Sequence, residues 1–447
     1  MRRDPVDLFP GAAGCLFDTL GAMAVLWGPG SVSRRWSQLA RNVVGGRSHA
    51  GAGPEAAALL VASDECEDGV SEVACALSVL ARGLPWAPEA CLVFVTEHCR
   101  AMAPSRGGRS LEADVAARLP KECLVVVAST DGVLGPTPSG EVAELWDAEG
   151  CACLLLRAGL GCRPPALCVV PDRPRKPARP DALHATQSLV AGGLRDAPHR
   201  FRDAAADAAA TAAAGSGVRV AQAVREAYGT PKFRGAAHLK AAFVERWLHA
   251  TRAAPEDLHV VLCGDTSTAR AVVASPSGRG AHGPLVGGCV AGSDELLGGT
   301  ARDLRPAAVV ALSLRGAGDA RASAAATVND GAGKVEYTDL CRAALRRGGV
   351  AAPGGRGVRP ALAVVATCVA RGPQFHGGER DVEARAHAEL LGAVPLVGFL
   401  ANGELGPRNA PATWREEDDE SDGEGAPTDY ALHAYTTCLG FLGPRAR

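Results

Sequence analysis

Four side chains in the last third of the chain could take part in chemistry: Cys368, Arg371, Glu404 and His433. Cys368 ends an apolar run and precedes Arg371 by three residues. A guanidinium beside a thiol can lower the thiol pKa and make the cysteine reactive toward electrophiles or oxidants. The alternative is an inert cysteine, since free cysteines are among the most buried residues.

Glu404 and His433 belong to strand ends of the same region, so a Cys–His–Glu hydrolase set is one hypothesis. The alternative is that Asn402-Gly403-Glu404 forms a tight turn and that His433 satisfies nearby backbone groups. The chain contains no Gly-x-Ser-x-Gly nucleophile elbow. We therefore predict a non-catalytic site that uses no cofactor and no metal ion.

The segment around Glu404 has a counterpart earlier in the chain. Residues 394–406 and 284–295 each contain a proline, a short apolar run, a glycine and a small-residue turn that ends in an acid. A unit used twice predicts two copies of one structural module. In the later copy Asn402-Gly403 supplies the positive φ angles of a tight turn. The turn delivers Glu404 at the mouth of a buried strand.

Composition limits the class of protein. With 447 residues the chain is too long for one core, which predicts two or three domains. A formal net charge of -2 argues against nucleic acid or a membrane surface as the main partner. The 15 cysteines are odd in number and irregularly spaced, which is typical of reduced thiols in the cytoplasm or nucleus. No apolar run is long enough to span a bilayer.

Short apolar runs alternate with helical stretches from about residue 55 onward, which predicts layered α+β or α/β domains. Valine and leucine dominate the runs, as expected for strands buried on both faces. The predicted strands are 58–62, 91–96, 123–128, 153–157, 167–170, 259–263, 285–290, 308–314, 361–367, 396–400 and 431–441. The predicted helices are 70–82, 111–119, 238–250, 338–347 and 382–391.

Three regions precede or interrupt this pattern. Residues 5–45 contain apolar sets at helical spacing, broken by Gly28-Pro29-Gly30, and predict short helices. A Pro- and Ala-rich stretch at about 171–230 reads as an insertion. The acidic run 415–429 predicts a solvated loop.

The C-terminal third resembles a FIST C domain. The resemblance rests on four motifs in order: Ala366-Thr367-Cys368-Val369-Ala370-Arg371-Gly372, then Val382-Glu383-Ala384, then Pro395 to Phe399 with Asn402-Gly403-Glu404, and finally Leu432 to Thr437. The region 55–315, with the earlier copy of the repeat, is similar to a FIST N domain. Residues 5–45 are similar to a degenerate F-box, in which Gly21 replaces the usual proline. The resemblance divides the chain into 5–45, 55–315 and 316–443, that is, a three-helix F-box and two pseudo-repeated mixed-sheet halves flanked by helices.

The resemblance implies a substrate-recognition subunit of a Skp–cullin–F-box ubiquitin ligase, which is not itself an enzyme. Its partners would be the Skp adaptor, the cullin scaffold and protein substrates such as chromatin enzymes or transcription factors, and not nucleic acid or a membrane. The expected adaptor interface is Leu8, Leu20, Leu26, Val32, Trp36 and Leu39.

The expected substrate or ligand pocket comprises Cys368, Arg371, Gly372, Gly398, Asn402, Gly403, Glu404, His433 and Tyr435. The alternative function is an intracellular sensory module that binds a small ligand and whose F-box no longer binds the adaptor.

Overall fold

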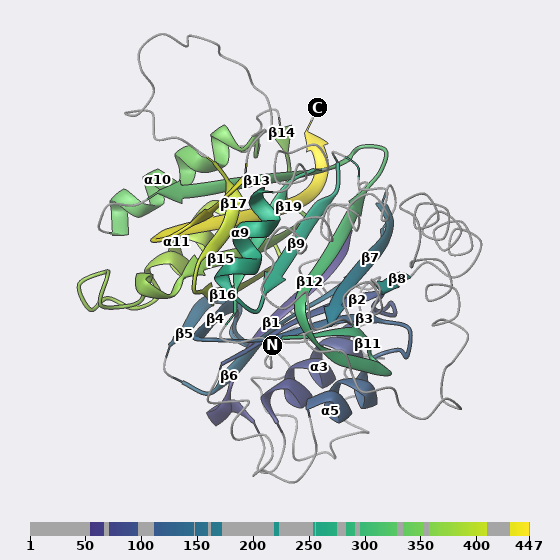
Figure 1. Cartoon of the computed structure of the whole chain (residues 1–447). Helices are drawn as coiled ribbons and strands as arrows, with labels where there is room; N and C mark the ends of the chain where they lie inside the picture. Colours follow the sequence, from purple (N-terminus) through teal and green to yellow (C-terminus); the bar gives the residue numbers. More distant parts are fainter. Residues whose placement is uncertain are drawn as a thin grey trace, which may run out of the picture.

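The computed structural model describes residues 54–66, 71–96, 111–146, 148–159, 162–171, 219–222, 254, 256–274, 283–290, 296–328, 334–351, 357–408 and 430–446. Within these residues it contains five α-helices, and the strands form two mixed sheets of 12 and 7 strands. The predicted mixed architecture of sheets and helices is confirmed at this level (Figure 1). The predicted F-box at 5–45, the helix at 238–250 and the acidic loop at 415–429 lie outside the described residues.

The strands fall into three successive units that repeat one order of elements. The first unit (55–157) contains β1 (Glu55–Ala62), η2 (Ser63–Glu65), α3 (Glu72–Gly83), β2 (Ala90–Thr96), α5 (Leu111–Arg118), β3 (Leu124–Thr130), β4 (Gly132–Pro136), β5 (Val142–Trp146) and β6 (Gly150–Arg157). The second unit (162–316) contains β7 (Cys162–Pro171), β8 (Arg219–Gln222), β9 (Leu258–Cys263), α9 (Thr266–Ala274), β10 (Leu285–Cys289), β11 (Leu296–Thr300) and β12 (Asp303–Gly316). The third unit (320–446) contains β13 (Ala320–Val328), α10 (Lys334–Arg347), β14 (Gly357–Val358), β15 (Leu362–Cys368), η7 (Val369–Arg371), α11 (Val382–Leu391), β16 (Leu396–Ala401), β17 (Glu404–Pro407), β18 (Tyr430–His433) and β19 (Thr436–Ala446).

Each unit is built on a parallel strand pair joined by a helix. The pairs are β2–β3, β9–β10 and β15–β16. An antiparallel strand closes each pair on one side: β6, β12 and β19 respectively. The outer neighbours of these closing strands are β1, β7 and β13, again antiparallel. The repeat seen in the sequence between 284–295 and 394–406 therefore has a third member at 124–136 in the first unit.

The units exchange strands in a cycle. The strand that follows each parallel pair leaves its own unit and pairs with another: β4 joins β16, β17 joins β10, and β11 joins β3. In the second unit β11 then pairs with β12, which continues along β9 without a break. β5 leads into β6, and β18 leads into β19. When each of these two pairs is counted as one bent strand, as β12 is, the order of hydrogen-bonded strands forms a closed ring through the three units.

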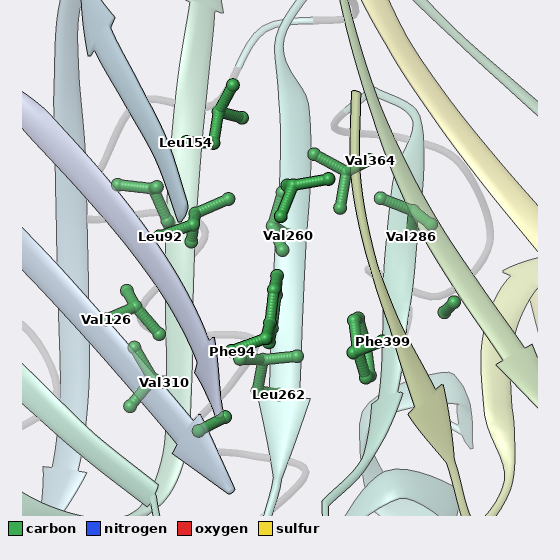
Figure 2. Close-up of a cluster of buried hydrophobic side chains, with 14 of the residues drawn as sticks. Leu92, Phe94, Val126, Leu154, Val260, Leu262, Val286, Val310, Val364 and Phe399 are labelled. Atoms are coloured by element: carbon green, nitrogen blue, oxygen red, sulfur yellow. The ribbon is translucent and has the colours of Figure 1, made fainter. Parts of the chain in front are cut away.

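The inner faces of the three units share one hydrophobic core. It contains the equivalent residues Leu92, Val260 and Val364, one from the first strand of each parallel pair. Figure 2 shows these side chains together with neighbours from all three units. The rings of Phe94 and Phe399 stack with centroids 4.5 Å apart. The positions equivalent to Phe399 are Ala128 and Gly288, and these small residues leave room for its ring.

Helices cover the outer face of each unit and bury a separate core there. Helices α3 and α5 cover the first unit, α9 the second, and α10 with α11 the third (Figure 1). Both faces of the central strands are therefore buried, which explains their continuous Val- and Leu-rich runs. In β2 and β3 all seven residues are buried.

The structure corrects the sequence-based strand prediction in two ways. Residues 431–441 form two strands and not one, because Ala434 and Tyr435 turn the chain between β18 and β19, with Tyr435 at a φ of 58°. The strands β4, β5, β8, β11, β13, β14 and β17 and the helix α9 were not predicted. The exchanged strands β4, β11 and β17 are only four or five residues long and contain glycine, so they resemble turns in sequence.

Candidate functional site

The candidate site lies at the carboxyl ends of β15 and β16, where Cys368 and Ala401 are partners in the parallel ladder. Carboxyl ends of parallel strands are the usual position for binding residues in such sheets. Beyond β16 the chain turns through Asn402 and Gly403, and Gly403 has a φ of 112° that favours glycine. Asn402 N–H donates to the Cys289 carbonyl and Cys289 N–H donates to the Gly403 carbonyl, both at 2.9 Å. These bonds attach the turn of the third unit to β10 of the second.

Glu404 begins β17 and is fully buried. Neither of its carboxylate oxygens has a hydrogen-bond partner of ordinary geometry. The Cys368 thiol and the backbone of Thr436 and Gly403 lie close enough to stabilise the charged form, but burial dominates and raises the pKa of Glu404 to about 8. A buried carboxyl without partners of ordinary geometry is costly, and this makes Glu404 a candidate functional residue.

Cys368 is not the activated thiol that the sequence suggested. The thiol is buried, and burial followed by the nearby Glu404 carboxyl raises its pKa. Backbone N–H groups of Ala370 and Tyr435 lower the pKa of Cys368 by a smaller amount. Of the two alternatives for Cys368, the structure favours the buried, inert cysteine, because the Arg371 guanidinium forms its ion pair with another residue.

Arg371 is wholly buried and forms an ion pair with Glu383 of α11, with Nε 2.5 Å from Oε1. The guanidinium carbon also lies over the rings of Tyr337 and Phe375, at 5.0 Å and 4.8 Å from their centroids. A planar guanidinium suits both contacts at once. Arg371 therefore holds the start of the 372–381 segment against α10 and α11.

Glu383 is the centre of a buried polar network. Its Oε2 accepts hydrogen bonds from the hydroxyls of Tyr337 (3.1 Å), Thr367 (3.1 Å) and Thr437 (2.7 Å). Burial alone would raise the pKa of Glu383, but Arg371, followed by His376, His387 and Thr437, lowers it to about 2. The network joins α10, β15, α11 and β19, so it fixes the geometry of the whole third unit under the site.

His433 does not complete a catalytic relay. Glu404 and His433 are directly opposite in the β17–β18 ladder, which brings their backbones together as the hydrolase hypothesis requires. His433 Nε2, however, contacts the Pro407 carbonyl at 3.1 Å. Within the described residues no hydrogen bond or ion pair joins its side chain to Glu404 or Cys368. Burial also lowers the pKa of His433.

The remaining expected site residues serve the fold around these groups. Gly398 lies inside β16, where a Cβ would approach Val365 and Leu134 to within 3.1–3.2 Å. Gly372 faces the Trp146 ring, which a Cβ would meet at 2.7 Å. Asn402 and Tyr435 are exposed at the rim of the site. The structure thus brings Cys368, Arg371, Gly403, Glu404 and Tyr435 into one neighbourhood.

The equivalent positions in the other two units do not carry this polar set. The ladder registers place Val133 and Leu296 at the position of Glu404. Thr96 of the first unit and Gly264 of the second take the position of Cys368. An acid thus stands where the internal copies have apolar side chains, and this distinguishes the third unit from the other two.

Sequence reasoning did not identify several residues of the network, namely Tyr337, Thr367, Glu383, His387 and Thr437. One signal was present: Glu383 lies between Val382 and Ala384 in a helix whose apolar face must be buried. Glu144 and Trp146 of β5 also went unrecognised, although Glu144 Oε1 accepts the N–H of Ala384 at 2.7 Å and so caps α11 from the first unit.

Comparison with known proteins adds no relative: no protein-family model matches the chain, and no curated protein matches it. Among the described residues no helix combines the length and apolar character needed to cross a membrane. No group of three or more His, Cys, Asp or Glu side chains in the described part of the chain could hold a metal ion.

Proposed function

We propose that the chain is the substrate-recognition subunit of a Skp–cullin–F-box ubiquitin ligase, with the layout of F-box only protein 22. Residues 5–45 dock the Skp adaptor through Leu26, Trp36 and the other apolar residues named above. The three units hold a protein substrate, and the complex acts in the cytoplasm and nucleus. The contribution of the chain to ubiquitin transfer is proximity, since it keeps a substrate lysine near the charged conjugating enzyme.

One observation carries the proposal: the polar residues of the third unit are arranged to hold a partner and not to transfer protons. The Cys368 thiol has a raised pKa, and His433 hydrogen-bonds to a backbone carbonyl. Arg371 and Glu383 neutralise each other inside the fold. Asn402 and Tyr435 are exposed beside these groups.

The affinity of the full chain for purified Skp adaptor tests the proposal. Loss of two of these apolar side chains, Leu26→Ala with Trp36→Ala, should weaken binding by at least about 30-fold, because even one hot-spot side chain contributes on the order of 2 kcal/mol. Val43→Ala in the same segment is the matched control and should change the affinity less than about twofold. Equal binding by the double variant and the control would refute the docking role of residues 5–45.

A second candidate, a small-ligand sensor, is favoured by the unpartnered carboxyl of Glu404. A ligand that supplies the missing hydrogen bonds would stabilise the folded state. The melting temperature of the full chain should then rise with single amino acids or thiol-reactive metabolites as probes. Glu404→Gln should abolish the rise, and an unchanged melting temperature across these probes would remove this candidate.

A further inference from the structure

Tyr435 is an exposed aromatic residue held in a strained conformation. It lies in the two-residue corner between β18 and β19, with 57% of its surface exposed and a φ of 58°. It is the one large hydrophobic residue that is exposed within the described residues. A non-glycine residue in the left-handed region costs about 1 kcal/mol or more, and such strain persists only where surrounding structure enforces it.

The buried Arg371–Glu383 network enforces this conformation. Arg371 Nη1 donates to the Tyr435 carbonyl at 3.3 Å, while its Nε pairs with Glu383. The next residue helps, because Thr436 Oγ1 donates to the Ala434 carbonyl at 3.0 Å. Thr437 then ties the start of β19 back to Glu383. These hydrogen bonds hold the backbone of Ala434 and Tyr435 in place, while the Tyr435 ring is exposed.

The fold itself does not need this ring. In the second unit the equivalent chain, β12, passes from its β11 partner to its β9 partner with no corner at all. In the first unit backbone N–H groups hold the corner before β6. Ser63 N–H donates to the Glu149 carbonyl, and Gly150 N–H donates to the Thr96 side-chain hydroxyl. The junctions before β6, within β12 and before β19 are thus stabilised in three different ways. Among the described residues, only the junction before β19 carries an exposed aromatic ring.

The surroundings of Tyr435 indicate what would bind there. Three segments meet around the Cys368 thiol, which lies within hydrogen-bonding reach of the backbone N–H groups of Ala370 and Tyr435. The exposed residues of η7, of the 402–403 turn and of the 434–435 corner are Ala370, Asn402, Ala434 and Tyr435, and none of these four carries a charge. A rigid tyrosine on an uncharged rim is suited to an uncharged protein segment, since tyrosine gives large contact area at low entropic cost.

We propose that Tyr435 is the anchor at which a protein substrate docks, through an uncharged segment that packs an aliphatic or aromatic side chain on the exposed ring. Arg371 is a positioning residue that acts on the substrate only through the Tyr435 backbone. This inference names the docking residue of the receptor function proposed above and rests on it. A second copy of this chain, a lipid surface and a nucleic acid are the competing occupants, and the experiment separates them.

The experiment begins with a photo-reactive benzoylphenylalanine at position 435 of the full chain, in cells, with the same group at the exposed Arg302 as control. Proteins crosslinked from position 435 but not from 302 are then purified, and their affinity for the full chain is measured. Tyr435→Asn removes the ring but keeps a residue that tolerates the left-handed conformation. We expect it to weaken the affinity by about tenfold or more, while Tyr435→Phe changes it less than about twofold.

Arg371 is tested in a double-mutant cycle on the same purified protein. If Arg371 acts through Tyr435, Arg371→Lys should weaken binding alone but add nothing in the Tyr435→Asn background. An additive loss would show a general structural role and refute the positioning assignment.

The docking proposal is overturned if position 435 crosslinks no protein, only a second copy of this chain, or only lipid or nucleic acid. It is also overturned if Tyr435→Asn binds the purified protein as tightly as the unsubstituted chain does. Adaptor binding is measured in parallel and should be unaffected by Tyr435→Asn. If the chain binds no adaptor but Tyr435→Asn still loses the purified protein, the ligase proposal fails and the docking residue stands.

Discussion

Replacing Glu404 by glutamine should change how the stability of the protein depends on pH. Glu404 is fully buried without hydrogen-bond partners of ordinary geometry, and burial raises its pKa from an ordinary value of 4.5 to about 8. The folded state therefore keeps a proton that the unfolded chain releases above about pH 4.5. Stability from this group is fully present below that pH and is lost as the pH rises through 8.

The magnitude follows from the two pKa values. Between pH 6.5 and 8.5 the unfolded carboxyl is ionised throughout, while the folded one passes from largely protonated to largely ionised. Linkage gives a loss of about 2 kcal/mol over this interval. Glutamine has nearly the same shape and does not titrate. The Glu404→Gln protein should therefore gain about 2 kcal/mol relative to the unsubstituted protein over the same interval.

The assay is urea unfolding of both proteins at several pH values, with the free energy of unfolding compared at each pH. Taking the difference matters because the chain has 15 cysteines, whose ionisation in the unfolded state changes stability above pH 8 in both proteins equally. A difference that stays constant from pH 6.5 to 8.5 would refute the reasoning. It would mean that Glu404 is ionised in the folded state with an ordinary pKa, and that water or another donor satisfies it.

Three further predictions concern the contacts between elements. Glu144, whose pKa burial and the nearby Glu383 raise to about 7, should make stability fall by about 2 kcal/mol between pH 5 and 8, and Glu144→Gln should remove this loss in the same urea assay. Glu383→Gln leaves Arg371 buried without its counter-ion and should lower the free energy of unfolding by about 3–5 kcal/mol. The control Glu389→Gln breaks the exposed pair with Arg342 and should lower it by less than about 1 kcal/mol, so similar losses in the two variants would contradict the buried network. Gly287→Ala would put a Cβ 1.8 Å from the backbone oxygen of Val261 and should lower the free energy of unfolding by about 3 kcal/mol or more. The control Gly135→Ala, whose Cβ would have its nearest atom at 3.5 Å, should be tolerated. An unchanged melting temperature for Gly287→Ala would mean that β10 and β9 lie further apart than described above.

The central strands could be predicted from the sequence because both of their faces are buried. Runs such as Cys91–Val95 and Leu396–Leu400 contain no polar side chain, and this pattern is readable without knowledge of the partners. The exchanged strands could not be found in this way. Val133 and Leu134 of β4 pair with β16 of the third unit, and nothing in their local sequence identifies a partner so far along the chain.

The candidate site was predictable in part for a similar reason. Asn402-Gly403 was predicted to supply the positive φ angles of a tight turn, and the chain does turn there, but of the two residues only Gly403 has a positive φ. The electrostatics were not predictable, because they depend on which charged groups meet. One hypothesis was that Arg371 lowers the pKa of Cys368. In the structure Arg371 instead forms an ion pair with Glu383 of α11. A glutamate in a helix is ordinarily solvated, and although the flanking Val382 and Ala384 were a signal of its burial, its pairing with Arg371 could be seen only in the folded structure.

The cyclic exchange of strands has a consequence for how the protein is made. Leu134 of β4 pairs with Gly398 of β16, roughly 260 residues later in the chain. At about 5–20 residues per second of translation, the first unit waits on the order of 10 to 50 seconds before its partner strand leaves the ribosome. During that time β4 and β5 present unpaired backbone edges and the inner face of the first unit is uncovered. We therefore expect a chain truncated before β16 to aggregate through its unpaired strand edges. We also expect the nascent chain to need chaperones until synthesis is nearly complete.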